Sequence, residues 1–157
     1  MNFSVLHPPP LFPYMHNDSS CVLRVEAGGR VALFPGDIGR HVEARLVREH
    51  AGQLKAELLI VPHHGSMSSS SEPFIARVSP RWAVMSTGAE NRFHLPRAEV
   101  VDRYRLAGAE ILDTARTGAL RFRLDASGAT LLSSRRQDQR RYWREPVAPG
   151  SGYAISN

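Results

Sequence analysis

Carboxylate and imidazole side chains follow the ends of two apolar segments of the sequence. Asp37 comes at the end of the first segment, and the adjacent histidines His63 and His64 come shortly after the run 58–61. If these segments are neighbouring strands of one sheet, the residues after them lie at the same sheet edge, where oxygen and nitrogen ligands can bind zinc or manganese. His94 is a further candidate ligand later in the chain. The pattern therefore predicts part of a divalent metal site.

Structural roles compete with metal binding for these residues. An aspartate after glycine and before a helix commonly caps that helix by accepting backbone amide hydrogen bonds worth about 1 kcal/mol, and Asp37 fits this description. Adjacent residues of a strand point to opposite faces, so only one of His63 and His64 is expected to be a ligand, while the other packs or forms a hydrogen bond. The sequence leaves both choices open.

The predicted secondary structure alternates between strands and helices. Residues 1–20 contain a proline cluster and are predicted to be a loop that leads into the first strand. Gly28-Gly29 predicts a hairpin between strands at 21–27 and 30–36. The later predicted elements are a helix at 40–50, a strand at 56–61, a helix that begins near Ser71, a strand at 81–87, a helix from Pro96 to Gly108, and strands at 109–113, 118–124 and 129–133. This alternation predicts an α/β (α+β) fold with layered sheets and helices.

The composition is that of a globular chain. The 157 residues are 42% hydrophobic and 22% charged, and they contain no apolar run near the roughly 20 residues that cross a bilayer. The first residues have no signal-peptide pattern, so we expect a soluble chain with no transmembrane segment. The single cysteine, Cys21, excludes an internal disulfide and a thiolate metal cluster, and its alternating apolar context predicts a buried thiol.

The net charge of +5 comes almost wholly from arginine, which suits phosphate and nucleic acid. Residues 134–157 are predicted to be a basic, partly disordered tail that follows a domain spanning residues 1–133. Tyr142 and Trp143 in this tail could stack on the bases of single-stranded DNA or pack on the domain. The candidate DNA contacts in the tail are Arg135, Arg136, Arg140 and Arg141.

Four stretches of the sequence, taken in order, resemble one protein family. They read NDSSCVLRV, LFPGDIGRHVEARLV, LLIVPHHGSMSSSSEPFIARVSPRWAVMSTGAENRF and TGALRF. Together they are similar to the closing half of the metallo-β-lactamase-like domain of the ComEC family, the DNA-uptake channel proteins of naturally competent bacteria. The resemblance implies that residues 1–133 are the C-terminal half of an αββα metallo-β-lactamase-like sandwich, and that the parent protein lies in the bacterial inner membrane.

The resemblance also implies roles for individual residues in a metal-dependent, nuclease-type hydrolase that acts on DNA phosphodiesters. Asp37 matches the carboxylate that bridges two metal ions, and the family's late histidine ligand falls on His64 or His63. Asp37 and His64 are therefore the candidate catalytic residues. Ser66 and Asn17 are candidate contacts of a phosphate group or of DNA.

Two departures from the family pattern predict that this chain is incomplete as an enzyme. The family's HxDxDH-type run, which supplies about four ligands, is absent, so Asp37 and the histidine pair supply only two or three. We therefore expect the chain alone to be inactive and to bind no zinc or manganese. The family's NRFGHP stretch reads NRFHLP here, so His94 replaces the glycine and becomes a ligand only if the loop shifts by one residue.

Two other functions are compatible with the same sequence. The chain could be a non-catalytic module that binds nucleic acid through its arginines, with an affinity that falls as the salt concentration rises. The parent domain could also act on a small phosphoester, because a fold does not determine a substrate. The predicted partners are single-stranded DNA, the rest of the parent membrane protein, and a second copy of the chain, since unpaired strand edges favour dimerisation.

Overall fold

The strands form one six-stranded mixed sheet and one separate two-stranded ribbon. The computed structural model describes residues 1–139. The sheet has the spatial order β1 (Asn2–His7), β2 (Val22–Ala27), β3 (Arg30–Phe34), β4 (Leu58–Ile60), β5 (Trp82–Met85) and β6 (Glu110–Asp113). The ribbon consists of β7 (Leu120–Asp125) and β8 (Gly128–Ser134), which pair antiparallel.

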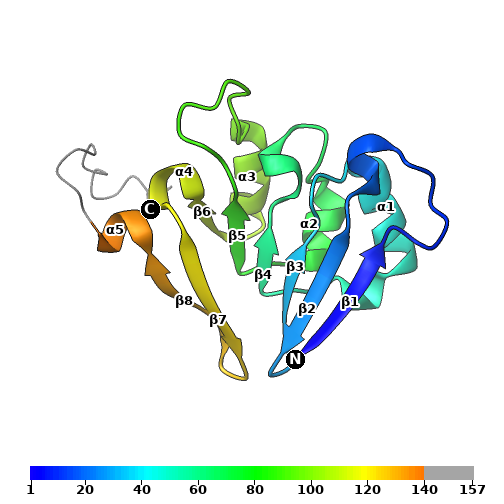
Figure 1. Cartoon of the computed structure of the whole chain (residues 1–157), viewed down its shortest axis with the longest axis horizontal. Helices are drawn as coiled ribbons and strands as arrows, with labels where there is room; N and C mark the ends of the chain where they lie inside the picture. The colour runs from blue at the N-terminus through cyan, green and yellow to red at the C-terminus, as the bar shows by residue number, and fades with distance from the viewer. Residues whose placement is uncertain (140–157) are drawn as a thin grey trace.

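Helices α1 (Arg40–Glu49), α2 (Glu72–Val78) and α3 (Ala98–Leu106) connect the parallel strands and lie behind the sheet in Figure 1. The short helices are α4 (Thr114–Thr117) and α5 (Arg135–Asp138), with 3-10 turns at η1 (His16–Ser19), η2 (Ala51–Gln53) and η3 (Pro62–Gly65). Within residues 1–139, no helix has the length and apolar character needed to cross a membrane. The mixed α/β fold class that the sequence predicts is confirmed.

The strand directions bring several strand ends to one edge of the sheet. β1, β2 and β3 pair antiparallel, and Gly28 and Gly29 close the predicted β2–β3 hairpin with positive φ angles, which glycine adopts without steric cost. β3, β4, β5 and β6 run parallel. Parallel neighbours end at the same edge, so the loops that follow β3, β4 and β5 lie together at the upper end of the sheet in Figure 1.

Alternating side chains give the sheet two apolar faces. Leu33, Leu59 and Met85 face the helices and are completely buried in the main core. Burying a side chain of this size contributes about 1.5–3 kcal/mol. The opposite face carries Ala32 and Leu58, which pack against the β7–β8 ribbon in a second, smaller core.

The second face of the sheet is only partly covered by the ribbon. An apolar groove of about 730 Å³ remains, with the first strands on one side and the ribbon on the other. Phe3 and Phe34 line this groove with exposed side chains. The described residues therefore form one helix layer, one sheet and a ribbon, and part of an apolar sheet face is open to solvent.

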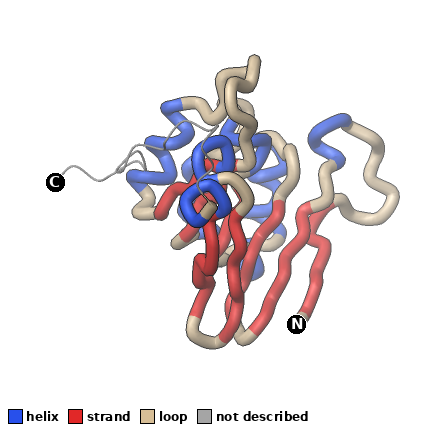
Figure 2. Tube along the Cα trace, turned by 60° about the vertical axis from the view of Figure 1, so that its left-hand side comes forward, coloured by secondary structure: helices blue, strands red, loops and turns tan. Residues whose placement is uncertain are grey.

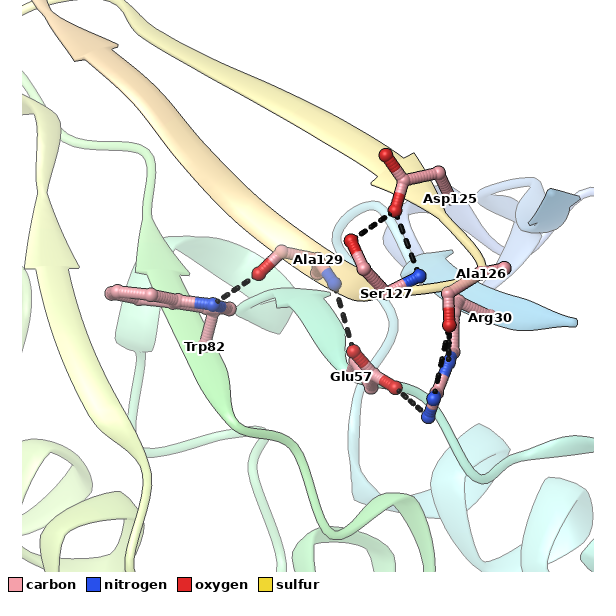
Figure 3. A network of polar contacts seen from close by, with 7 residues as sticks. All are labelled: Arg30, Glu57, Trp82, Asp125, Ala126, Ser127 and Ala129. Carbon is pink, nitrogen blue, oxygen red and sulfur yellow. Dashed lines mark hydrogen bonds and ion pairs between the residues drawn. The ribbon is translucent and has the colours of Figure 1, made fainter. Parts of the chain in front are cut away.

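A network of polar contacts fixes the tip of the ribbon on the sheet (Figure 3). Glu57, just before β4, accepts hydrogen bonds from Arg30 Nη1 at 2.6 Å and from the Ala129 amide at 2.8 Å. Trp82 Nε1 donates to the Ala129 carbonyl oxygen at 2.9 Å. Glu57 thus joins β3, β4 and β8, although these segments are far apart in the sequence.

Two sequence-based expectations near the N-terminus were wrong. Residues 2–7, predicted to be a loop, form β1, because the free edge of β2 offers unpaired backbone groups to an extended segment. Cys21, predicted to be buried, is exposed. Cys21 lies just before β2, whose buried residues Val22 and Val25 are three positions apart, so burial in this strand does not follow the strict alternation on which the prediction relied.

The helix predicted to begin at Pro96 begins instead at Ala98. Arg97 is the extended N-cap residue, and its amide donates to the Gly65 carbonyl oxygen at 3.1 Å. The segment before α3 is therefore held against η3 rather than wound into the helix. At the other end of the chain, Ser134 ends β8, and the last eighteen residues, 140–157, lie outside the described part.

Replacing Glu57 with alanine tests the contacts that hold the ribbon. The change leaves the buried Ala129 amide without its acceptor, so the free energy of unfolding in urea should fall by about 1–3 kcal/mol. The matched control is Glu110→Ala, which removes an exposed ion pair to Arg81 and should cost less than about 0.5 kcal/mol. Equal effects of the two substitutions would contradict a role for Glu57 in fixing the ribbon.

Candidate functional site

The loops that follow β3 and β4 lie side by side at one edge of the sheet. Asp37 follows Gly36, which turns the chain after β3 with a positive φ angle. His63 and His64 lie in η3, directly after β4, and the His63 amide donates to the Gly36 carbonyl oxygen at 3.0 Å. The parallel pairing of β3 with β4 therefore brings the aspartate and both histidines to one place.

Asp37 and His64 form a close carboxylate–imidazole pair. His64 Nε2 lies 3.5 Å from Asp37 Oδ1, and both side chains are partly exposed. His64 Nδ1 lies 2.8 Å from the Ser86 carbonyl oxygen, which only accepts hydrogen bonds, so Nδ1 carries a proton, and in the neutral ring, the form that binds metal, Nε2 has its lone pair on the side of Asp37. Two ligand atoms bound tetrahedrally at about 2.1 Å to one ion are about 3.4 Å apart. The pair is thus spaced as two ligands of one ion would be.

His63 is held differently, because the chain engages both of its ring nitrogens. Asn17 Nδ2, from η1, donates to His63 Nε2 at 3.2 Å, and His63 Nδ1 lies 3.1 Å from Ser68 Oγ. Since Nε2 accepts the Asn17 hydrogen bond, the proton lies on Nδ1. Figure 2 shows η1, on the segment between β1 and β2, at the same end of the sheet as these loops. His63 therefore has no lone pair left free by its partners, in contrast to His64.

The two histidines are not on a strand, so the expected alternation between faces does not apply to them. Both have positive φ angles, 48° for His63 and 56° for His64, within the η3 turn. Their ring centroids are 6.5 Å apart. What distinguishes the two rings is their hydrogen-bond partners, which no sequence pattern reveals.

The structure does not use Asp37 as the cap of α1. The N-cap residue is Gly39, whose amide donates to Asp18 Oδ1 at 2.8 Å, and the Arg40 amide donates to the Ser68 carbonyl oxygen at 3.0 Å. Asp18 therefore has the helix-capping role that the sequence offered as the alternative for Asp37. Sequence reasoning could not find this contact, because the two residues are 21 positions apart and no local motif links them.

A cavity of about 880 Å³ gathers most of the candidate residues. Its lining includes Asp37, His63, His64, Ser66 and His94, and Asn17 reaches the site through its hydrogen bond to His63. Within residues 1–139, no three or more histidine, cysteine, aspartate or glutamate side chains are grouped as a metal site requires. The described residues therefore bring one carboxylate and one imidazole, Asp37 and His64, close together, with His94 on the wall of the same cavity.

The predicted basic contacts lie elsewhere or outside the described residues. Arg135 and Arg136 are in α5, and neither lines the cavity. Arg136 Nη1 donates to the Ala115 carbonyl oxygen of α4, so this arginine forms an intramolecular hydrogen bond between α5 and α4. Arg140 and Arg141, together with the aromatic pair of the tail, lie outside the described residues.

A buried glutamate, Glu43 of α1, holds the serine-rich loop beside the cavity. Its carboxylate accepts hydrogen bonds from the amides of Ser70 and Ser71 and has no exposed surface. Burial raises the pKa of the Glu43 carboxyl, while the hydrogen bonds from the loop act in the opposite direction. The same loop carries Ser68, the partner of His63. Sequence reasoning missed Glu43, because a glutamate is rarely fully buried and its sequence context gives no sign of these partners.

These features define a mixed α/β domain whose parallel strand ends carry a candidate metal centre. No family model matches the chain. The chain is homologous to the C-terminal part of competence proteins of the ComEC family. It is 37% identical over 145 residues to Competence protein ComA of Neisseria gonorrhoeae and 33% identical over 123 residues to ComE operon protein 3 of Bacillus subtilis. It is also 32% identical over 122 residues to Recombination protein 2 of Haemophilus influenzae.

These relatives are much longer than the chain. The matches cover 92%, 78% and 77% of this chain, but only 21%, 16% and 15% of the respective relatives. The chain therefore spans about a fifth of the length of the curated relatives it matches.

The buried carboxyl of Glu43 predicts a pH-dependent stability. Its pKa is raised above the ordinary 4.5, so the folded state binds the proton more tightly than the unfolded state. The free energy of unfolding, relative to that of Glu43→Gln, should be highest below pH 4.5 and fall as the pH rises through the raised pKa. Urea unfolding of both chains at a series of pH values measures this difference. A relative stability that increases with pH would contradict it.

Proposed function

We propose that the chain is part of a competence-related DNA internalisation protein. In this protein it would supply one side of a metal-dependent, nuclease-type hydrolase domain that acts on DNA phosphodiesters. The names of two relatives, Competence protein ComA and ComE operon protein 3, support the competence role. The observation that carries the chemical part is the Asp37–His64 pair, whose 3.5 Å spacing suits two ligands of one ion.

The donor set of the site suits zinc or manganese, which bind imidazole nitrogen and carboxylate oxygen. When bound, such an ion polarises a phosphoryl oxygen and activates water for attack. Asp37 and His64 would hold it from this chain, with His94 as a further candidate on the cavity wall. The remaining ligands would come from an HxDxDH-type run, which these 157 residues do not contain.

The hydrogen bonds of the chain favour His64 over His63 as the ligand. The Ser86 carbonyl oxygen fixes the proton of His64 on Nδ1, and a partner of this kind is what orients ligand histidines in metal sites. His63 is held between Asn17 and Ser68 and would form a polar wall of the cavity. The second N–H of Asn17 Nδ2 and the Ser66 hydroxyl would donate hydrogen bonds to the oxygens of a phosphate group.

The wider context of the site is also part of the proposal. Single-stranded DNA and the rest of a parent protein in the bacterial inner membrane are the proposed partners. A second copy of the chain is a third, because part of the apolar sheet face is open in the described residues.

These roles can be tested with a chimera of the gonococcal Competence protein ComA in which this chain replaces the matching segment. With Mn²⁺ and labelled single-stranded DNA, the chimera should cleave, and Asp37→Asn or His64→Ala should lower the rate at least about a hundred-fold, because each removes a ligand. The matched control is His41→Ala, which removes an exposed histidine on α1 outside the cavity lining. The 157-residue chain by itself should not cleave above a buffer control.

Two results would overturn the proposal. If the chimera cleaves DNA equally well with Asp37→Asn, Asp37 is not a ligand and the proposed metal centre is wrong. A chimera that binds DNA in a salt-dependent manner but never cleaves would favour the non-catalytic nucleic-acid-binding module instead.

A further inference from the structure

A loop at the rim of the cavity presents an aromatic ring to solvent. Phe93 is 59% exposed and lines the same cavity as Asp37 and His64. The Arg92 guanidinium carbon lies 4.8 Å from the centroid of the Phe93 ring, and Arg97 also lines the cavity. Several apolar side chains of the described residues are exposed, but Phe93 is an exposed aromatic ring in the lining of the cavity that also holds the proposed metal ligands, where it can contact a ligand bound there.

The loop that carries this ring is fixed by its own hydrogen bonds. The Asn91 side chain donates to the Leu95 carbonyl oxygen at 2.8 Å and accepts from the Leu95 amide at 2.9 Å. The Arg97 amide donates to the Gly65 carbonyl oxygen at 3.1 Å, which joins the loop to the turn that carries His64. The backbone that carries Phe93 is therefore held beside the turn with the proposed metal ligands, so less conformational entropy of the loop is lost when a ligand binds.

The arginines of the cavity lining lie on the same loop as the exposed ring, an arrangement that suits a nucleic acid strand. Arg92 and Arg97 flank the ring in sequence, and arginine pairs readily with phosphate oxygens. The carboxylates of the lining are Asp37, which faces His64, and Glu99 of α3. The formal charges of these four groups cancel, but Arg92 lies beside the exposed ring, and an aromatic ring with a neighbouring arginine can hold single-stranded nucleic acid, because any base can stack on the ring.

We propose that Phe93 is a stacking platform for a base of single-stranded DNA, and that Arg92 and Arg97 contact the adjacent phosphates. The Arg92 guanidinium covers part of the ring, and the exposed remainder accepts the base. This inference rests on the proposed function, since it states how the DNA strand is held at the same cavity. It assigns Phe93 to binding and positioning, not to the cleavage step.

Binding of labelled oligonucleotides to the 157-residue chain in EDTA tests the proposal without any contribution from metal. The probes are an oligothymidylate of about ten nucleotides and a base-free oligomer with the same phosphates. The chain should bind the oligothymidylate at least about five-fold more tightly than the base-free oligomer, because one stacked base is worth roughly that factor or more. Phe93→Ala should abolish this preference, and Phe93→Trp should restore it.

Leu106→Ala, which truncates another exposed apolar side chain on α3, is the matched control and should leave the preference unchanged. Arg92→Ala should weaken binding of both probes about equally and reduce its salt dependence. Equal binding of the two probes by the unsubstituted chain, or a base preference that survives Phe93→Ala, would overturn the stacking proposal. Neither result would bear on the proposed metal ligands, which are tested separately by the rate of DNA cleavage by the Asp37 and His64 variants.

Discussion

The parallel pairing of β3, β4 and β5 is the constraint on which the candidate site depends. Ala32 lies opposite Leu58, and Leu58 lies opposite Trp82, so the three strands advance together and their following loops leave the sheet at one edge. Buried side chains such as Leu33 and Leu59 hold the strands against α1, α2 and α3. Without this pairing, Asp37 and His64 would be separated, because they are far apart in the sequence.

Hydrogen bonds from neighbouring elements then orient the two histidine rings. The carbonyl oxygen of Ser86, directly after β5, accepts a hydrogen bond from Nδ1 of His64 and so orients the ring. Glu43 of α1 holds the serine-rich loop, which in turn supplies Ser68 to His63. Two neighbouring histidines thus acquire different properties from elements that are remote in sequence, and only one of them keeps a lone pair beside the aspartate.

The residues that sequence patterns predicted are those whose roles depend on local periodicity. Turn residues and apolar spacing predict three elements correctly: the hairpin at Gly28, the helix that buries Leu46, and the strand before the histidines. The errors and omissions depend on contacts between distant segments. β1 exists because β2 has a free edge, and Asp18 caps a helix that begins 22 residues later. The burial of Glu43 likewise depends on a loop supplied by another part of the chain.

The central claim is that Asp37 and His64 are two ligands of one ion and that His63 is not a ligand. Two ligands hold an ion too weakly for the 157-residue chain to retain zinc at ordinary concentrations, so the most direct test forces occupancy with a large excess of Zn²⁺ while the imidazole nitrogen resonances of the isotope-labelled chain are followed by NMR. The account predicts that Nε2 of His64 shifts, that Asp37→Asn greatly weakens this shift, and that Nε2 of His63 is unchanged. A shift of His63 Nε2, or a His64 shift that is as strong in Asp37→Asn, would contradict the claim.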